Sequence, residues 1–296
     1  MYLEYDQPLV DEFRTLLDSK PPKGKQFEQL IQDFLEEHTE LIPTQSLVSP
    51  RLHMNMIISK FALDKSTITD YVYIVRNSAE WEITFVELER PNKAIFTENP
   101  KRPTLHSEFN NARDQLGEWK AFVDTHRDQV IESLAPLMRP DMYPKNPVFF
   151  RYQLIIGRSA GKNHSTERKA YFAQIQKNSD MQFLTYDNLI ARYEANARLR
   201  RHVVKESKRR FSFKVLQPSP EHIFSVLLSD VIELTKTQEQ QLIAEGYDIP
   251  AWKAGSYLVL NNKHVAPTAD EIREGTLQAL ASGFRRPRSA RQSQED

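Results

Sequence analysis

Apolar residues near the start of the chain recur at helical spacing, which predicts two amphipathic helices. The apolar positions of the first helix are Leu9, Phe13, Leu16 and Leu17. A Pro-Pro-Lys-Gly break at residues 21–24 ends this helix. Residues 25–38 place apolar side chains at i, i+3, i+4, i+7 and i+8, and polar residues spaced four apart run beside that stripe. These polar residues are Glu28, Gln32 and Glu36.

After Pro43 the hydrophobic period changes from about 3.6 residues to two, which is typical of strands. Alternation predicts a strand over residues 52–63. Residues 70–75 are rich in Tyr, Val and Ile, and a third strand is predicted over residues 82–88. Short polar turns separate the three segments, so we expect an antiparallel meander. Pro91 ends the third strand because proline cannot donate a hydrogen bond to a neighbouring strand.

Helical spacing returns over residues 104–134. Residues 148–156 are almost continuously apolar, as expected of a strand buried on both faces, and this strand stops at Gly157. The next predicted elements are a helix around residues 165–177, a strand at residues 181–185 and a helix that begins at Tyr186 with Asp187 as its cap. This order predicts an α/β (α+β) fold in which helices flank a mixed sheet.

Beyond about residue 215 the pattern becomes mainly helical. Helices are predicted over residues 221–234, 237–245 and 268–282. The last two begin with the capping boxes Thr237-x-x-Gln240 and Thr268-x-x-Glu271. The expected organisation is an N-terminal helix and linker at residues 1–24, a main domain at residues 25–214, a mainly helical region at residues 215–283 and a disordered, arginine-rich tail at residues 284–296.

Composition narrows the chemistry. The 296 residues include 40 Lys and Arg against 40 Asp and Glu, so attraction to nucleic acid must come from local clusters of charge. The chain has no cysteine, which excludes disulfides, thiolate zinc sites, iron-sulfur clusters and a cysteine nucleophile, and fits a reducing cytoplasm. No stretch approaches the roughly 18 apolar residues of a membrane span, so we expect a cytoplasmic protein without a membrane partner. The chain also lacks a Walker loop, GxGxxG and GxSxG.

Three acidic residues lie where the second and third strands of the meander should meet. The period of two puts Glu87 and Glu89 on one face of the third strand, and Asp70 begins its neighbour. Carboxylates this close raise one another's pKa, so they stay ionised together only around a cation. A hard divalent ion with oxygen ligands, Mg²⁺ or Mn²⁺, is the natural occupant. The alternative is that these are strand-end charges that face water.

The strongest local charge lies between Arg192 and Lys214, where nine basic residues face only two acids, Glu194 and Glu206. The candidate nucleic-acid-binding residues are Arg198, Arg200, Arg201, Lys205, Lys208, Arg209 and Arg210. They would bind a phosphate backbone, or alternatively form a solvated face. Phe211 and Phe213 could stack on bases or belong to the core of a strand.

Several motifs in order resemble the nuclease domain of the Shedu antiphage defence proteins, within the PD-(D/E)XK superfamily. The motifs are Phe34-Leu35-Glu36-Glu37, Thr69-Asp70-Tyr71, Val86-Glu87-Leu88-Glu89-Arg90-Pro91, Ala112-Arg113-Asp114-Gln115-Leu116 with Trp119, Ile155-Ile156-Gly157-Arg158 and Thr185-Tyr186-Asp187-Asn188-Leu189. The resemblance covers roughly residues 25–195. It implies a restriction-endonuclease-like fold, a divalent metal, DNA cleavage in bacterial immunity and a homo-oligomer, either a dimer or a tetramer.

The resemblance also implies roles for single residues. Asp70 and Glu87 match the metal-binding acids, and Gln115 matches a helix glutamine beside the active site of many superfamily members. Glu36, or alternatively Glu28, matches an acid on the leading helix. The motifs around Gly157 and Tyr186 match signatures for which a structural role is expected.

One position departs from the family pattern. The family usually has lysine two residues after the second acid, and this chain has Glu89 there. A carboxylate cannot stabilise developing anionic charge, but it can act as a third metal ligand or a general base. Lys60 or Lys93 could supply the missing cation.

Three hypotheses therefore stay open. The first is a metal-dependent DNA endonuclease that holds Mg²⁺ through Asp70, Glu87 and Glu89. The second is a catalytically impaired nucleic-acid-binding module of the same fold that acts as a sensor or regulator. The third is a partner protein that binds other proteins through residues 215–296.

Overall fold

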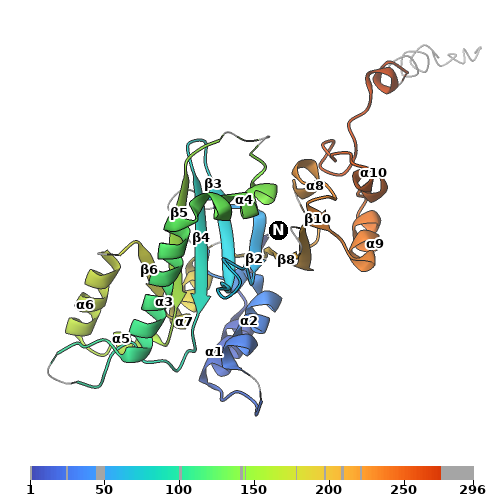
Figure 1. Ribbon diagram of the computed structural model, residues 1–296. Coiled ribbons are helices and arrows are strands. Elements are labelled where there is room, and N and C mark those ends of the chain that lie inside the picture. The colour runs from blue at the N-terminus through green and yellow to red at the C-terminus, as the bar shows by residue number, and fades with distance from the viewer. Residues whose placement is uncertain are drawn as a thin grey trace, which may run out of the picture.

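The fold centres on an eight-stranded mixed sheet with helices on both faces, which confirms the predicted α/β class (Figure 1). The protein is seen here in a computed structural model. It describes residues 2–24, 26–44, 51–99, 102–140, 143, 145–177, 179–196, 198–207, 210–220 and 222–274. Within these residues, the strand order of the large sheet is β10-β9-β8-β2-β3-β4-β5-β6.

The predicted meander forms the middle of this sheet. Strands β2 (Leu52–Ser59), β3 (Tyr71–Arg76) and β4 (Trp81–Leu88) pair antiparallel in sequence order. Strands β5 (Val148–Ile155) and β6 (Met181–Leu184) then extend the sheet parallel to β4. The change from antiparallel to parallel pairing requires long helical connections after β4 and β5, as the alternation of sequence periods predicts.

The other edge of the sheet comes from the segment with many basic residues. Strand β8 (His202–Ser207) pairs parallel with β2, and β9 (Arg210–Val215) returns antiparallel to it. Phe211 and Phe213 are buried in the core, which confirms the strand-core alternative for these two aromatics. Strand β10 (Ile232–Glu233) pairs parallel with β9 and so joins the C-terminal region to the same sheet.

One face of the sheet packs against α3 (Ser107–Thr125) and α4 (Arg127–Met138). Ile83 and Phe85, at odd positions of β4, point to this face. The single helix predicted over residues 104–134 is wrong, because the helix ends at His126 and a second one begins directly after it. The hydrophobic pattern continues across the break, since both helices bury apolar side chains in the same core.

The opposite face packs against α1 (Gln7–Asp18), α2 (Phe27–Glu37) and α7 (Tyr186–Ala195). Even positions of β4, Val86 and Leu88, belong to this second core. The two predicted N-terminal helices are confirmed, and their apolar stripes are the sides that the sheet buries.

Shorter elements complete the described chain. They are β1 (Tyr2–Leu3), which pairs with β7 (Arg198–Leu199), the 3₁₀ turn η1 (Thr39–Leu41), and the helices α5 (Ser159–Lys162), α6 (Thr166–Lys177), α8 (Ile223–Val226), α9 (Lys236–Ala244) and α10 (Ile249–Lys253). The helix predicted over residues 221–234 is wrong. It stops after one turn at Val226, because the following residues pair with β9, where Phe211 N–H donates to Val231 O at 2.8 Å.

Two predicted helix starts also need correction. Helix α9 is capped by Thr235 with Gln238 and not by Thr237 with Gln240, and Thr185 takes the capping position expected of Asp187. The Thr268–Glu271 capping box is confirmed, and residues 269–274 are helical. The remainder of that helix and the tail at residues 284–296 lie outside the described residues.

Within the residues that the structure describes, no helix combines the length and hydropathy needed to cross a lipid bilayer. The predicted domain boundaries stay predictions.

Candidate active site

The end of β4 and the start of β3 come together at one edge of the sheet core. Asp70 N–H donates to Val86 O at 3.1 Å, and Tyr71 pairs with Val86 in the strand register. Glu87 continues the row of odd residues that faces α3, and its Oε1 accepts a hydrogen bond from Gln115 Nε2 at 2.7 Å. The strand period and the helix together therefore bring Glu87 and Gln115 into contact.

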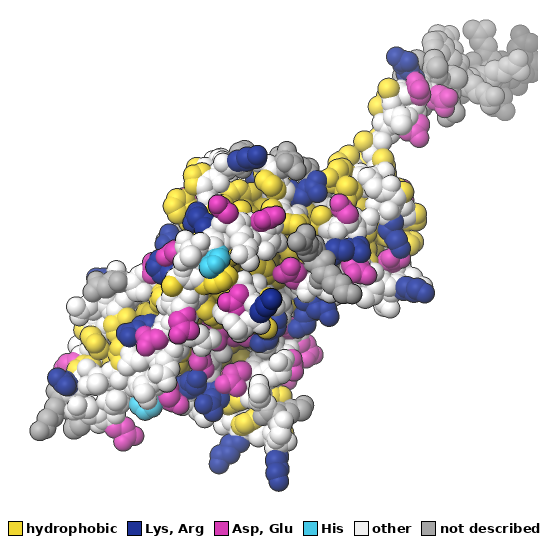
Figure 2. Space-filling model, in the orientation of Figure 1, with side chains coloured by type: hydrophobic (Ala, Val, Ile, Leu, Met, Phe, Trp, Pro, Cys, Tyr) yellow, Lys and Arg dark blue, Asp and Glu magenta, His cyan; other side chains and the backbone are white. Residues whose placement is uncertain are grey.

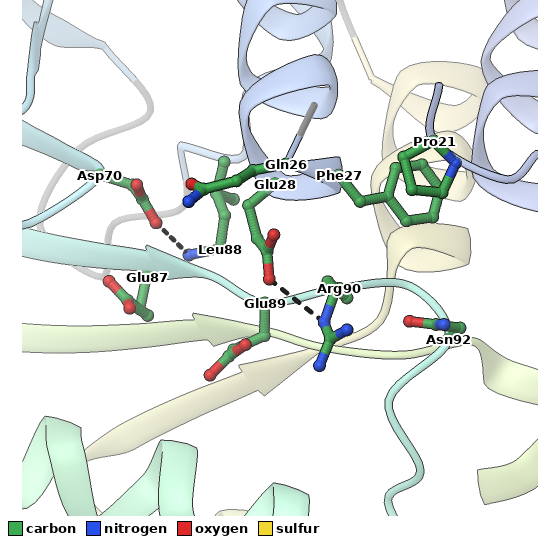
Figure 3. A pocket seen from close by; sticks show the side chains of 10 residues that line it. All are labelled: Pro21, Gln26, Phe27, Glu28, Asp70, Glu87, Leu88, Glu89, Arg90 and Asn92. Carbon is green, nitrogen blue, oxygen red and sulfur yellow. Dashed lines mark hydrogen bonds and ion pairs between the residues drawn. The ribbon is translucent and has the colours of Figure 1, made fainter. Parts of the chain in front are cut away.

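All three predicted carboxylates line one pocket of about 510 Å³ (Figure 3). Asp70 reaches it from the start of β3, and Glu87 and Glu89 from the end of β4. Asp70 and Glu89 are buried, and Glu87 is partly buried. The structure thus brings together the three acids that the sequence pattern predicts to converge.

The pKa of Glu87 reflects its burial and its closeness to the other two carboxylates. Burial, followed by the charges of Asp70 and Glu89, raises the pKa of Glu87 to about 9, against the opposing effects of Gln115 and Lys60. Carboxylates that crowd one another in a poorly hydrated pocket favour the protonated form in this way. A divalent cation bound between these oxygens would reverse that preference.

Both candidate lysines bind one of the acids. Lys60 Nζ donates to Asp70 Oδ1 at 2.5 Å, and Lys93 Nζ forms an ion pair with Glu89 Oε2. The second oxygen of Asp70 accepts from the Leu88 N–H at 2.7 Å. Several carboxylate oxygens are therefore already in use. Correspondingly, no three His, Asp or Glu side chains in the described part of the chain form a ready-made metal-binding group.

The residues present fit a hard divalent cation in their chemistry, because all three offer carboxylate oxygens. Their fit in geometry requires the two lysines to move. Lys60 and Lys93 are flexible side chains with rotatable ammonium groups, so they can release an oxygen without backbone movement.

Hydrogen bonds to the backbone hold the strand end that carries Glu89. Gly157 N–H donates to Arg90 O at 3.3 Å, and Tyr186 Oη donates to Glu89 O at 2.6 Å. Gly157 has φ +65°, and a Cβ there would lie only 2.6 Å from Lys93 O. The glycine is thus required by a close backbone approach, which gives the Gly157 and Tyr186 signatures a structural role.

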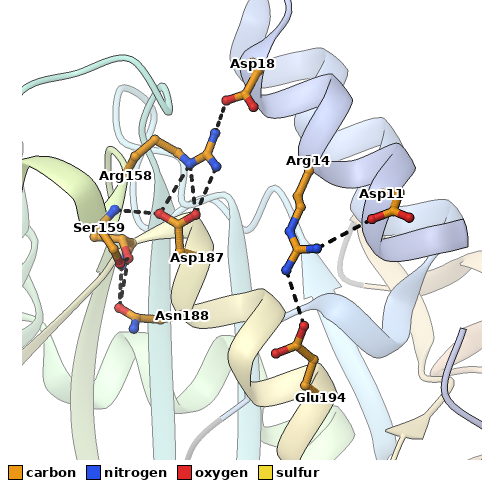
Figure 4. A network of polar contacts seen from close by, with 9 residues as sticks. Asp11, Arg14, Asp18, Arg158, Ser159, Asp187, Asn188 and Glu194 are labelled. Atoms are coloured by element: carbon orange, nitrogen blue, oxygen red, sulfur yellow. Dashed lines mark hydrogen bonds and ion pairs between the residues drawn. The ribbon is translucent and has the colours of Figure 1, made fainter. Parts of the chain in front are cut away.

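A polar network anchors this turn to the outer helices (Figure 4). Arg158 Nε donates to Asp187 Oδ1 at 3.1 Å, and Ser159 N–H donates to Asp187 Oδ2 at 2.5 Å. Arg158 also forms an ion pair with Asp18 at the end of α1. Asp187 is therefore a partner of Arg158 and not the cap of α7, which explains why the cap prediction fails.

Glu36 does not line the pocket. Its Oε1 accepts from Ser59 Oγ at 2.7 Å and its other oxygen pairs with Lys214, in a buried polar cluster with Gln32. Glu28, the alternative acid on the same helix, does line the pocket. The reason is the helix rise: eight residues of helix separate the two acids by about 12 Å, and only the first turn of α2 reaches the pocket.

Three arginines of the basic segment make contacts within the protein. Arg201 is partly buried, with Nη1 donating to Thr39 O at 2.7 Å, and burial lowers its pKa to about 10. Arg200 forms an ion pair with Glu40 at 3.6 Å. The Arg198 guanidinium lies over the rings of Tyr5 and Tyr193, 5.3 and 5.2 Å from their centroids. These three arginines therefore have partners within the protein, and phosphate binding by this segment stays a prediction.

The other described candidates, Lys205 and Arg210, lie on β8 and β9. Lys205 and Arg210 are exposed there, whereas Lys208 and Arg209 lie outside the described residues. Figure 2 shows Lys and Arg side chains scattered among Asp and Glu over the face that it presents. Arg90 is a site residue that the charge pattern does not single out. It also lines the pocket, and its signals in the sequence are its place directly after the third strand and its position in the Val86–Pro91 motif.

A comparison with known protein families identifies the family of this chain. The family described as Shedu protein SduA, C-terminal, matches residues 25–190, which is more than half of the chain. The chain belongs to this Shedu family. The match includes nine of the ten residues that line the carboxylate pocket, and Shedu membership connects the chain to antiphage defence. A comparison with curated proteins finds no match.

Proposed function

We propose that this Shedu protein is a metal-dependent DNA endonuclease that hydrolyses phosphodiester bonds in antiphage defence. The observation that carries the proposal is the convergence of Asp70, Glu87 and Glu89 in one pocket, together with the raised pKa of Glu87. Strongly shifted carboxyl groups in a cleft are characteristic of functional sites. We also propose that the metal is Mg²⁺ or Mn²⁺.

The three carboxylates would hold the ion, since oxygen ligands suit Mg²⁺ and Mn²⁺. When bound, a divalent ion lowers the pKa of water and neutralises charge on a phosphodiester. Gln115 keeps Glu87 oriented toward the pocket through its 2.7 Å hydrogen bond. Lys60 and Lys93 keep two positive charges beside the carboxylates and become available to the phosphate when a cation takes over their carboxylate partners.

Glu89 acts as a third ligand in this proposal, and Lys93 supplies the cation that the family usually places at position 89. Because Lys93 lies four residues after Glu89, the tight turn between them brings the Lys93 ammonium group back to the Glu89 carboxylate. Positive charge therefore stays beside the pocket carboxylate Glu89, although its position in the sequence has changed.

The test is cleavage of duplex DNA by the purified protein with Mg²⁺ or Mn²⁺. Asp70→Asn and Glu87→Gln should each lower the rate by about a hundredfold or more, since each removes a charged ligand. Glu118→Gln, an exposed acid on α3, is the matched control and should leave the rate unchanged. Absence of cleavage by the parent protein, or cleavage that survives both substitutions, would refute the proposal.

The second candidate is a nucleic-acid-binding module that has lost cleavage. The departure at Glu89 and the pairing of both lysines with carboxylates favour it. This module would bind DNA without metal, and its affinity would fall steeply with salt. Metal-independent binding without cleavage would replace the first proposal with this one.

We further propose a homo-oligomer, either a dimer or a tetramer. Exposed apolar side chains in the C-terminal region, among them Val259 and Leu260, offer a surface for association. Light scattering of the full chain should give a mass of two or four copies, and a monomer at micromolar concentration would contradict this proposal.

A further inference from the structure

We infer that Arg90 is a phosphate-binding residue of the candidate active site and that Glu28 holds its guanidinium until nucleic acid binds. The inference rests on the proposed nuclease function and goes beyond it, because it assigns the group that receives the substrate phosphate. Arg90 Nε lies 3.3 Å from Glu28 Oε1, and the pair bridges the end of β4 and the first turn of α2 (Figure 3).

The charge of the pocket creates the need for such a group. Its lining includes four acids, Glu28, Asp70, Glu87 and Glu89, and among the ten lining residues Arg90 alone is basic. A phosphodiester is repelled by carboxylates at this range, so it needs cationic groups beside any bound metal. The guanidinium is planar and presents donors that match phosphate oxygens in pairs, which a lysine ammonium does not.

The partner of Arg90 differs from the partners of the two lysines. Lys60 and Lys93 bind carboxylates of the predicted metal-binding trio, whereas Arg90 binds an acid on a separate helix. A cation bound by the trio would therefore leave the Arg90–Glu28 pair intact. An anion that enters the pocket competes directly with Glu28 for Arg90.

The ion pair is exposed enough to exchange. The Arg90 and Glu28 side chains are 44% and 37% exposed, and ion pairs at such positions contribute little to stability. The backbone of Arg90 is nevertheless fixed, because its carbonyl oxygen accepts from the N–H groups of Lys93 and Gly157 at 3.2 and 3.3 Å. The guanidinium can thus swing from carboxylate to phosphate about a stationary backbone.

The chain offers a matched control pair. Arg14 and Glu194 lie 3.4 Å apart with side chains 45% and 41% exposed, and they join α1 to α7 outside the lining of the pocket (Figure 4). Substitutions in this pair remove the same kind of interaction without changing the charge of the pocket.

The experiment measures binding of a fluorescein-labelled DNA duplex by anisotropy, in Ca²⁺ to limit turnover, and cleavage of the same duplex in Mg²⁺ or Mn²⁺. Arg90→Ala should weaken binding about tenfold to a hundredfold and reduce the slope of log affinity against log salt by about one. Arg90→Lys should recover only part of the loss. Glu28→Gln should tighten binding severalfold, and this gain should vanish in the Arg90→Ala background. Arg14→Ala and Glu194→Gln should bind as the parent does.

The outcomes separate this inference from the function on which it rests. If the parent protein binds and cleaves DNA while Arg90→Ala binds with parental affinity and salt dependence, the inference is overturned and the nuclease function stands. If the parent neither binds nor cleaves, both fall. Should Arg90→Ala fail to fold, as judged by its melting temperature, Glu28→Gln decides, and an unchanged affinity in that variant overturns the inference.

Discussion

Replacing Gly157 with alanine should displace the turn that carries Lys93. Gly157 has φ +65°, and an added Cβ would lie 2.6 Å from Lys93 O. Real Cβ atoms keep at least 3.0 Å from such neighbours, so the carbonyl must retreat by about 0.4 Å or more. The opposing group is backbone, which cannot rotate away as a side chain would.

The expected loss of stability in Gly157→Ala has two contributions. A left-handed conformation costs alanine about 1 kcal/mol, and overpacking against fixed atoms adds about 1–3 kcal/mol. In a chain of this size each 1 kcal/mol lowers the melting temperature by about 2–4 °C, so a decrease of roughly 5–15 °C is expected. Because displacements at catalytic groups are costly, we expect DNA cleavage to fall by about tenfold in protein that is still folded.

Gly246→Ala is the control for the backbone contribution alone. Gly246 also has a positive φ, +89°, but an added Cβ there meets no atom within 4 Å. The melting temperatures of the two variants, together with cleavage rates measured below both of them, separate the backbone strain of a positive φ from the contact between the added Cβ and Lys93 O. Equal losses of stability in both variants, with parental cleavage in Gly157→Ala, would refute the claim that this glycine supports the pocket.

Two further predictions concern stability at low pH and the unusual residue at position 89. Burial of His202 lowers its pKa from 6.5 to about 4. Below pH 6.5 this histidine therefore binds a proton in the unfolded chain but stays neutral in the folded protein. The free energy of unfolding should therefore fall by up to about 3 kcal/mol as the pH is lowered from 6.5 towards 4. His202→Asn keeps an acceptor for the Gln217 N–H, and it should flatten the curve of urea unfolding free energy against pH. Parallel curves for parent and variant would contradict this prediction. Glu89→Lys restores the family residue but breaks the ion pair with Lys93 and places two cations side by side, so we expect cleavage to be lost and the melting temperature to fall, whereas raised cleavage would show that Glu89 is not a ligand.

Local patterns predicted the parts of the fold that short-range physics determines. The alternation over residues 52–88 specified a meander because the turns are short, and the same alternation placed Glu87 on the face of α3. The convergence of Asp70 with that strand follows from strand pairing alone. For these reasons the carboxylate pocket was the part of the site that could be derived from spacing.

Other features of the fold and of the site depend on contacts between residues that are far apart in the sequence. Asp187 occupies a position typical of a helix cap, but Arg158, 29 residues earlier, takes its oxygens. Arg201 belongs to a run of basic residues in the sequence, yet its guanidinium donates to the carbonyl oxygen of Thr39, which is 162 residues away. No local pattern contains such partners, so these contacts could not be predicted from the sequence.

Calorimetric titration of Mn²⁺ into the purified protein tests the central claim most directly. The account predicts saturable binding in the parent and in Glu118→Gln, and loss of that binding in both Asp70→Asn and Glu87→Gln, with all four proteins folded by circular dichroism. Absence of Mn²⁺ binding in the parent, or parental affinity in both pocket variants, would contradict the claim that these carboxylates hold a divalent cation.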